Sequence, residues 1–243
     1  MRNIMTIATK EFKSYLASPM AYIITSIFLL GTGLFFINFG SFDSSAASIT
    51  TSMSGFLGNN YYITVVLLLM ALLTMRLLAE ERKLGTIELL MTAPVRDSEV
   101  IIGKFLGSMG LLLVMLVFTI YYPIMLIVFG DPDMGPIGTG YLGFFLLGCI
   151  SLAVGIFASS LTSNQIVSAV VAGGILLALW FLGTAAANLP PTLGNVIGYF
   201  SPSTYFSDFV RGIIDTRGII YDISITALFL FLAIRSLENS RWS

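Results

Sequence analysis

Residues 80–99, EERKLGTIELLMTAPVRDSE, form a long polar interval with long apolar runs on both sides of it. Within this interval four apolar side chains recur at helical spacing and share one face, namely Leu84, Ile87, Leu90 and Met91. A loop that only joined two membrane helices would not need such a face. We therefore interpret this stripe as a docking surface for another protein in the cytoplasm. A stripe that lay flat on the bilayer surface would show the same spacing.

The composition is that of an integral membrane protein. Hydrophobic residues make up 56% of the 243 residues and charged residues 10%, whereas about a quarter of a soluble domain is charged. The uncharged runs cover residues 14–42, 44–75, 105–130 and 134–207, and a shorter run covers 219–234. Because a membrane helix needs about 20 residues, the fourth run has room for two helices and the others for one each. We predict an all-α protein with spans at 20–39, 61–78, 100–129, 138–157, 167–187 and 219–234.

The basic residues predict an orientation for these six spans. Ten of the twelve Lys and Arg residues would lie on one side of the membrane, and only Arg211 and Arg217 on the other. Because Lys and Arg near short loops favour the cytoplasmic side, we expect both termini and residues 80–99 in the cytoplasm, in a plasma or inner membrane. If residues 219–234 did not cross, Arg235 and Arg241 would change sides and the bias would keep its sign.

Residues 1–18 are predicted to form an interfacial helix. Six apolar residues between positions 3 and 16 share one arc, whereas Lys10 and Lys13 face the opposite side. The arc consists of Ile4, Met5, Ala8, Phe12, Tyr15 and Leu16. Such a helix can lie at the acyl boundary, with its lysines facing anionic lipid headgroups.

Residues 188–218 form the longest predicted external segment. Ser201 followed by Pro202 is typical of a helix N-terminus with proline at the first helical position. Apolar residues then recur at Phe206, Phe209, Val210, Ile213 and Ile214. We expect a short external helix that enters the outer leaflet or covers a cavity mouth, and a surface loop with one helical turn is the alternative.

Two further local features bear on the spans. The third span is longer than the hydrocarbon is thick, so we expect it to tilt, to protrude or to bend near Pro123. The polar residues at positions 159–165 predict a tight cytoplasmic turn between the fourth and fifth spans.

Several kinds of chemistry are excluded by what the sequence lacks. The chain has no histidine, and its single cysteine, Cys149, lies within a predicted span, so His-dependent metal and hydrolase motifs are excluded. Gly103-Lys104 lacks the other residues of a phosphate-binding loop. No predicted span carries a charge near its middle, which argues against an ion-coupled carrier. We expect no catalytic residue, metal, cofactor or nucleic acid partner. A carboxylate enzyme that used Asp208, Asp215 and Asp222 remains the enzymatic alternative.

The motif Glu81-x-x-x-Gly85-Thr86-x-Glu88-Leu89-Leu90-x-x-x-Pro94, followed by Gly103-Lys104, resembles the membrane subunits of type-2 ABC exporters. The resemblance is closest to the gliding-motility-associated branch and covers nearly the whole chain as a single permease domain. It implies a coupling helix between spans two and three that sits in a groove of a separate cytoplasmic ATPase. It also implies that two membrane subunits, most simply identical copies, face each other around a path lined by spans two and five.

The resemblance gives each residue of the motif an expected role. Leu84, Ile87, Leu90 and Met91 would fill the groove of the ATPase, and Glu81 and Glu88 would pair with its basic residues. Gly85 would permit a tight approach, Thr86 would cap the coupling helix, and Pro94 would redirect the chain.

The leading hypothesis is therefore a half-size export permease that is driven by a separate ATPase. The alternative is a membrane anchor that transmits mechanical work from an ATPase to an extracytoplasmic accessory subunit and moves no solute. Asp131, Asp133, Asp208, Asp215 and Asp222 would then form a docking surface on the outer face. A third hypothesis is an ion channel that needs no ATPase.

Overall fold

The computed structural model describes residues 2–39, 55–85, 96–129 and 132–239, and all the secondary structure elements in these residues are helices. Six helical stretches are long and apolar enough to cross a membrane, which confirms the predicted all-α membrane fold. They are α2 (Pro19–Phe39), α4 (Asn60–Thr74) continued by α5 (Ala79–Lys83), α7 (Asp97–Thr119) continued by α8 (Tyr121–Phe129), α9 (Met134–Leu161), α10 (Gln165–Ala186) and α13 (Thr216–Asn239).

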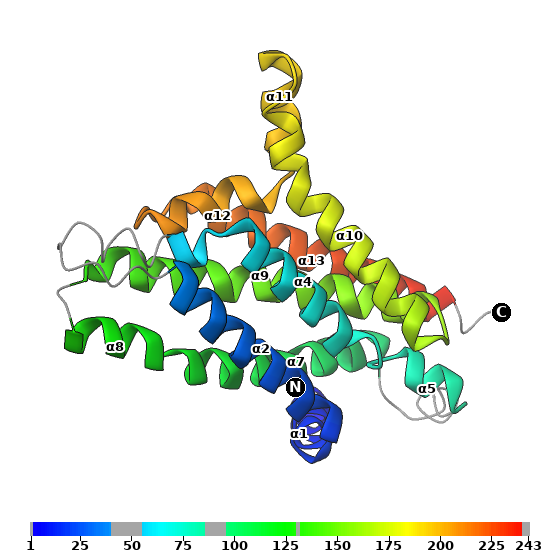
Figure 1. The fold of residues 1–243 in the computed structure, drawn as a ribbon. Coiled ribbons are helices and arrows are strands. Elements are labelled where there is room, and N and C mark those ends of the chain that lie inside the picture. The colour runs from blue at the N-terminus through cyan, green and yellow to red at the C-terminus, as the bar shows by residue number, and fades with distance from the viewer. Residues whose placement is uncertain (1, 40–54, 86–95, 130–131, 240–243) are drawn as a thin grey trace.

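Helix α9 lies at the centre of the bundle. Of its most apolar 18 residues 78% are buried, compared with 17% for α13, and it contacts α4, α7, α10, α12 (Pro202–Val210) and α13 (Figure 1). Its neighbours approach closely where α9 carries glycine. A Cβ atom on Gly148 would overlap the side chain of Leu112 in α7, and one on Gly143 would overlap Phe209 in α12. Small residues at these positions therefore allow the helices to pack closely.

The third span is interrupted between α7 and α8, close to Pro123, where a bend was expected from the sequence. Pro123 has no N–H, so it cannot donate to the carbonyl of Thr119 one turn earlier. The hydroxyl of Tyr141 in α9 donates to this carbonyl instead, over 2.8 Å. The interruption is thus compensated by a hydrogen bond from the central helix.

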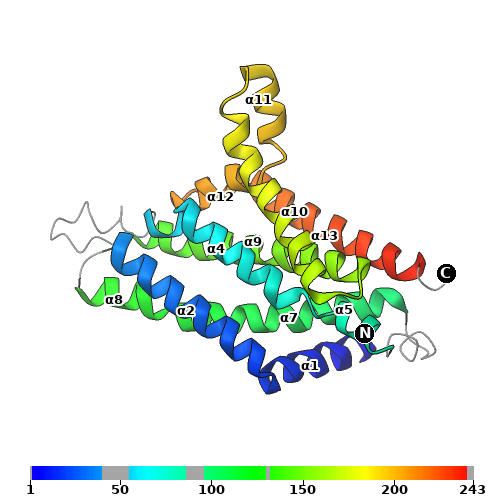
Figure 2. The same ribbon diagram turned by 45° about the vertical axis from the view of Figure 1, so that its right-hand side comes forward.

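The amphipathic helix α1 (Arg2–Ala17), the short helix α5 and the last turns of α13 lie at one end of the bundle, together with both termini (Figures 1 and 2). At the other end, α11 (Pro191–Gly198) folds back beside the end of α10, and the two project beyond the remaining helices. The segment that contains residues 80–85 therefore lies at the end that α1 occupies.

The helix predicted to follow Ser201 is shorter than the sequence indicated. α12 begins at Pro202 as expected but ends at Val210, because Gly212 has a φ of +89°, which stops the helix. Ile213 and Ile214 are exposed rather than part of the apolar face. The hydroxyl of Ser201 does not cap α12; it donates to the carbonyls of Leu179 and Trp180 in α10.

The polar turn after the fourth span is also shorter than predicted. Ser159 and Ser160 belong to α9 and are fully buried, and the turn covers only residues 162–164 before Asn164 caps α10. The prediction was wrong for the two serines because hydroxyl groups can be buried in a helix when they have hydrogen-bond partners. The partners of Ser159 lie in the segment that leads to residue 85, whereas Ser160 donates to the carbonyl of Phe157 in its own helix.

Candidate functional site

Helix α1 packs along α7, where glycines provide the space (Figure 2). A Cβ atom on Gly103 would overlap Ile7, and one on Gly107 would overlap Glu11. The face that touches α7 is therefore rotated from the predicted arc. Met5 and Leu16, which belong to the predicted lipid-facing arc, do not contact α7 closely and are 63% and 42% exposed. α1 is a helix as predicted, but its best-packed side faces protein.

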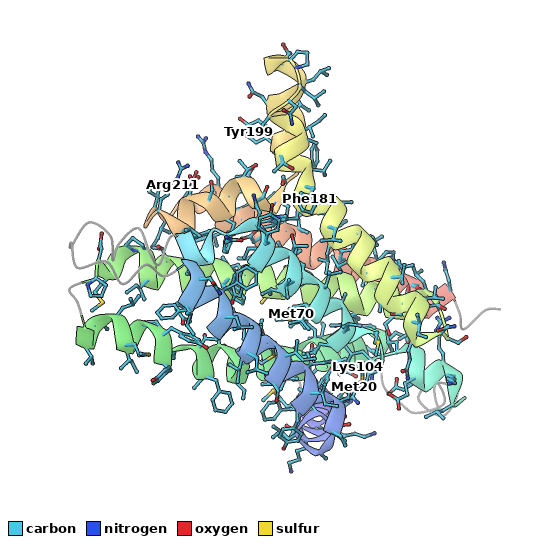
Figure 3. All side chains as sticks on the ribbon, in the orientation of Figure 1. Met20, Met70, Lys104, Phe181, Tyr199 and Arg211 are labelled. Carbon is cyan, nitrogen blue, oxygen red and sulfur yellow. The ribbon has the colours of Figure 1, made fainter. Side chains whose placement is uncertain are left out.

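Lys104 lies at the centre of this junction. It is 3% exposed, and its Nζ lies 2.8 Å from Oε1 of Glu81 in α5 and 3.4 Å from Oε2 of Glu11 in α1. The side chains of the two carboxylates are 30% and 21% exposed, so both are partly shielded from water. Attraction between such charges is much stronger than between charges on the surface. Lys104 in α7 therefore joins α1 and α5 to the third span (Figure 3).

The start of α5 is held by the central helix. The hydroxyl oxygen of Ser159 accepts hydrogen bonds from the N–H groups of Leu78 and Ala79, both over 2.9 Å, and donates to the carbonyl of Met75 over 3.1 Å. The first N–H groups of a helix lack partners within the helix. Ser159 satisfies two donors at this N-terminus from a different helix, and so fixes α5 to α9.

The end of α4 is also held by the central helix, here through close packing. Thr74 closes this helix and lies against Gly155, where α9 has no side chain. Gly85 then follows α5 with a φ of +69°, the left-handed conformation common just after a helix. The path from the second span to residue 85 is therefore defined by packing at Gly155, by the Ser159 hydroxyl and by the Lys104 ion pairs.

A further cluster joins α1 to the end of the second span. Arg76 donates to the hydroxyl of Ser18 over 2.6 Å and lies 5.2 Å from the ring centroid of Tyr15. Burial, with a smaller contribution from the charge of Glu11, raises the pKa of Tyr15 well above its usual range, and Arg76 opposes this shift. The phenol therefore stays protonated and remains a donor to the carbonyl of Leu73.

Three of the residues proposed to contact an ATPase lie in the described part of the chain. Leu84 is 67% exposed, Gly85 follows the end of α5, and Glu81 pairs through Oε1 with Lys104 of its own chain. The other six, Thr86, Ile87, Glu88, Leu90, Met91 and Pro94, lie outside the described residues. Among the described residues no group of His, Cys, Asp and Glu side chains could hold a metal ion.

The family model described as ABC-2 family transporter protein matches residues 5–234 of the chain. This chain belongs to the ABC-2 transporter family. Its members are the multi-pass permease subunits of ABC transporters, which associate with an ABC ATPase subunit and often dimerise. No curated protein matches the chain. The match is to the ABC-2 family as a whole and does not single out the gliding-motility branch.

Several residues of this ABC-2 junction were not predicted as site residues. The sequence contained an indication of the role of Lys104, because this lysine comes directly before a long uncharged run and lies between Gly103 and Gly107. Glu11 gave a weaker signal, as an acidic residue in a basic amphipathic helix. The sequence contained no indication of the role of Ser159, since nothing in its neighbouring residues shows that it would cap a helix 80 residues earlier.

Replacing Ser159 by alanine is expected to destabilise the start of α5 by about 1–2 kcal/mol, because two buried N–H groups lose their acceptor. Hydrogen exchange of the peptide that contains Leu78 and Ala79 should become about tenfold faster. Ser163→Ala, in the exposed turn after α9, is the matched control and should leave exchange in this peptide unchanged. Equal exchange in the two variants would contradict the capping role.

Proposed function

We propose that this chain is a single-domain permease subunit of an ATP-driven exporter, in which a separate cytoplasmic ATPase binds residues 80–99. The observation that carries the proposal is the junction at the base of this segment. α5 immediately precedes residues 86–95 and α7 follows them closely, and the two helices are joined by the pair between Glu81 and Lys104. A segment anchored on both sides can pass a displacement to the spans as rigid bodies.

Leu84, the first residue of the apolar stripe, is exposed. We infer that Ile87, Leu90 and Met91 complete the contact with the ATPase and that Glu88 pairs with one of its basic residues. Export, the gliding-motility branch and cytoplasmic termini are inferred from the motif between Glu81 and Pro94 and from the distribution of basic residues. A homodimer would enclose the path, because six helices are few for a wide one.

Membrane lipids are proposed as partners of α1. Lys10 and Lys13 lie on its exposed side, together with Met5, while the opposite side packs on α7. This arrangement suits anionic headgroups. α1 would then move with the third span, to which Lys104 joins it, at the membrane surface.

One observation supports the alternative of an anchor that serves an extracytoplasmic accessory subunit. α11 and the two residues after it project with the end of α10 beyond the other spans, and Leu193, Val196, Tyr199 and Phe200 are each more than half exposed. Such a surface on a helix outside the spans is typical of a protein contact. The two functions differ in whether solute moves when ATP is hydrolysed.

Purification of the full chain from its native membranes in mild detergent tests the proposal. An ABC ATPase should co-purify, and Thr86→Cys in a Cys149→Ala background should crosslink to it. Cys149 is a buried free cysteine, so the background change removes the competing thiol. Absence of an ATPase from the purified complex would contradict the proposal. ATP-dependent solute movement in proteoliposomes supports the permease, and ATPase stimulation without flux supports the anchor.

Truncation of the stripe should weaken the complex. Ile87→Ala and Leu90→Ala are each expected to reduce affinity for the ATPase about tenfold, because apolar anchors dominate such contacts. Thr92→Ala changes the opposite face of the same helical pattern and is the control. Titration of ATPase activity with reconstituted permease measures the effect, and equal affinity of all three variants would argue against the stripe as the contact.

A further inference from the structure

A groove opens between the N-terminal end of α4, the C-terminal half of α10 and one face of α12, on the half of the bundle away from α5. Its volume is about 770 Å³, within the usual range for small-molecule sites of about 300–1,000 Å³. α10 and α12 border it on two sides, and Figure 3 labels Phe181 in α10 and Arg211 directly after α12. The groove does not include any residue of the junction around Lys104.

The wall of the groove is apolar where α10 meets α12. Trp180 and Phe206 are 2% and 4% exposed, and their rings meet edge to face with centroids 5.7 Å apart. Gly183 lies next to Ser203, where a Cβ atom would overlap the hydroxyl. Because there is no side chain at Gly183, α12 approaches α10 closely and the aromatic pair forms a fixed wall.

Two polar residues of the groove carry donor groups that no other described residue accepts. The indole N–H of Trp180 donates to Oδ1 of Asn60 over 3.3 Å, so the amide oxygen of Asn60 is occupied and its N–H donors face away. Neither the amide nitrogen of Asn60 nor the guanidinium of Arg211 is bonded to another described residue. Arg211 is the only charged residue among the described residues that line the groove.

By contrast, the hydroxyl groups here already have partners among the described residues. Thr204 donates to the carbonyl of Gly198 in α11 over 3.1 Å, and the hydroxyls of Ser201 and Ser203 are bonded to each other. Thr184 donates to Phe181 and Ser207 donates to Thr204, both over 2.8 Å. Among the described residues that line the groove, the unbonded donors therefore belong to Arg211 and Asn60, and the positive charge belongs to Arg211. Such a site complements an acceptor-rich anion joined to an apolar group.

We propose that this groove binds an anionic phospholipid-like amphiphile from the bilayer. The headgroup would contact Arg211 and Asn60, and the first part of the chain would lie on the wall formed by Trp180 and Phe206. Phe181 is 42% exposed and extends the apolar surface of α10 beside the groove. In the proposed permease, such an amphiphile is the class of molecule that is exported, and that assignment rests on the proposed function. Binding itself requires neither ATP nor an ATPase.

The test uses the fluorescence of Trp180 in the full-length protein, with Trp242→Phe to make Trp180 the single tryptophan. The protein is placed in nanodiscs of phosphatidylcholine. One preparation contains phosphatidylglycerol with brominated chains, and the other contains phosphatidylcholine with brominated chains at the same mole fraction. Brominated phosphatidylglycerol should quench Trp180 with an apparent affinity about fivefold higher, as expected for one arginine and one anionic lipid.

Three variants test whether Arg211 causes the preference for phosphatidylglycerol over phosphatidylcholine. Arg211→Gln should abolish it, Arg211→Lys should retain most of it, and Arg217→Gln, which changes an exposed arginine that does not line the groove, should leave it unchanged. Arg211 is exposed, so its substitution should not prevent folding. Equal quenching by both lipids in the parent protein, or an undiminished preference in Arg211→Gln, would overturn the proposal. Failure to recover an ATPase would leave this result intact and would count only against the proposed function.

Discussion

Replacing Lys104 by alanine is expected to lower the free energy of unfolding by about 3–5 kcal/mol, because the partly buried carboxylates of Glu11 and Glu81 would lose their shared partner. Denaturant titration in detergent micelles measures the loss. The substitution should also separate α5 from α7. We therefore expect the reconstituted permease to retain affinity for its ATPase through residues 84–91 but to lose most of the transport coupled to ATP hydrolysis.

The Arg235–Glu238 pair provides the control for this result. It lies on the surface of α13, with its two side chains 61% and 38% exposed, so Arg235→Ala should cost less than about 1 kcal/mol. Lys104→Met combined with Glu11→Gln and Glu81→Gln removes all three charges and should recover much of the stability. If Lys104→Ala were as stable as Arg235→Ala, the ion pairs would not hold the junction together.

Replacing Gly155 by alanine is expected to destabilise the protein by about 3 kcal/mol or more, because the new methyl group would overlap Thr74 at the end of α4. Relief of this overlap requires α4 to move away from α9, and only the turn at residues 75–78 separates α4 from α5. We therefore expect faster hydrogen exchange at the start of α5 as well as a lower midpoint of unfolding. The second readout separates a displaced junction from a general loss of packing.

Gly174→Ala in α10 is the matched control, since a Cβ atom at Gly174 would have no other atom within 4 Å. Alanine is a better helix former than glycine, so this variant should be as stable as the parent or up to about 1 kcal/mol more stable. A similar loss in both variants would show that contact with Thr74 does not determine the effect at Gly155.

The six spans could be predicted from the sequence because hydrophobic length is a local property. The run at 219–234 was long enough to indicate a helix, and α13 extends it to Thr216–Asn239 by adding polar residues at both ends. Helix ends were harder to predict, because they depend on partners elsewhere in the chain. Ser159 and Ser160 resembled a turn and proved to be buried in α9, where their hydroxyl groups have acceptors.

The site was predicted only in part, for a related reason. The stripe that includes Leu84 and Leu90 is visible as a spacing, whereas the support beneath it depends on contacts between distant segments. Glu11, Glu81 and Lys104 come from three separate helices, and no local pattern pairs them. The rotation of α1 onto α7 has the same origin, since the space at Gly103 and Gly107 selects the contacting face.

The hydrogen bond from Tyr141 to the carbonyl of Thr119 ties the interrupted point of the third span to α9. Beyond this point, the hydroxyl of Tyr122 in α8 donates to the carbonyl of Leu29 in α2 over 3.3 Å. Before it, Lys104 in α7 is paired with Glu11 in α1 and Glu81 in α5. The two halves of one span are therefore fastened to different neighbours.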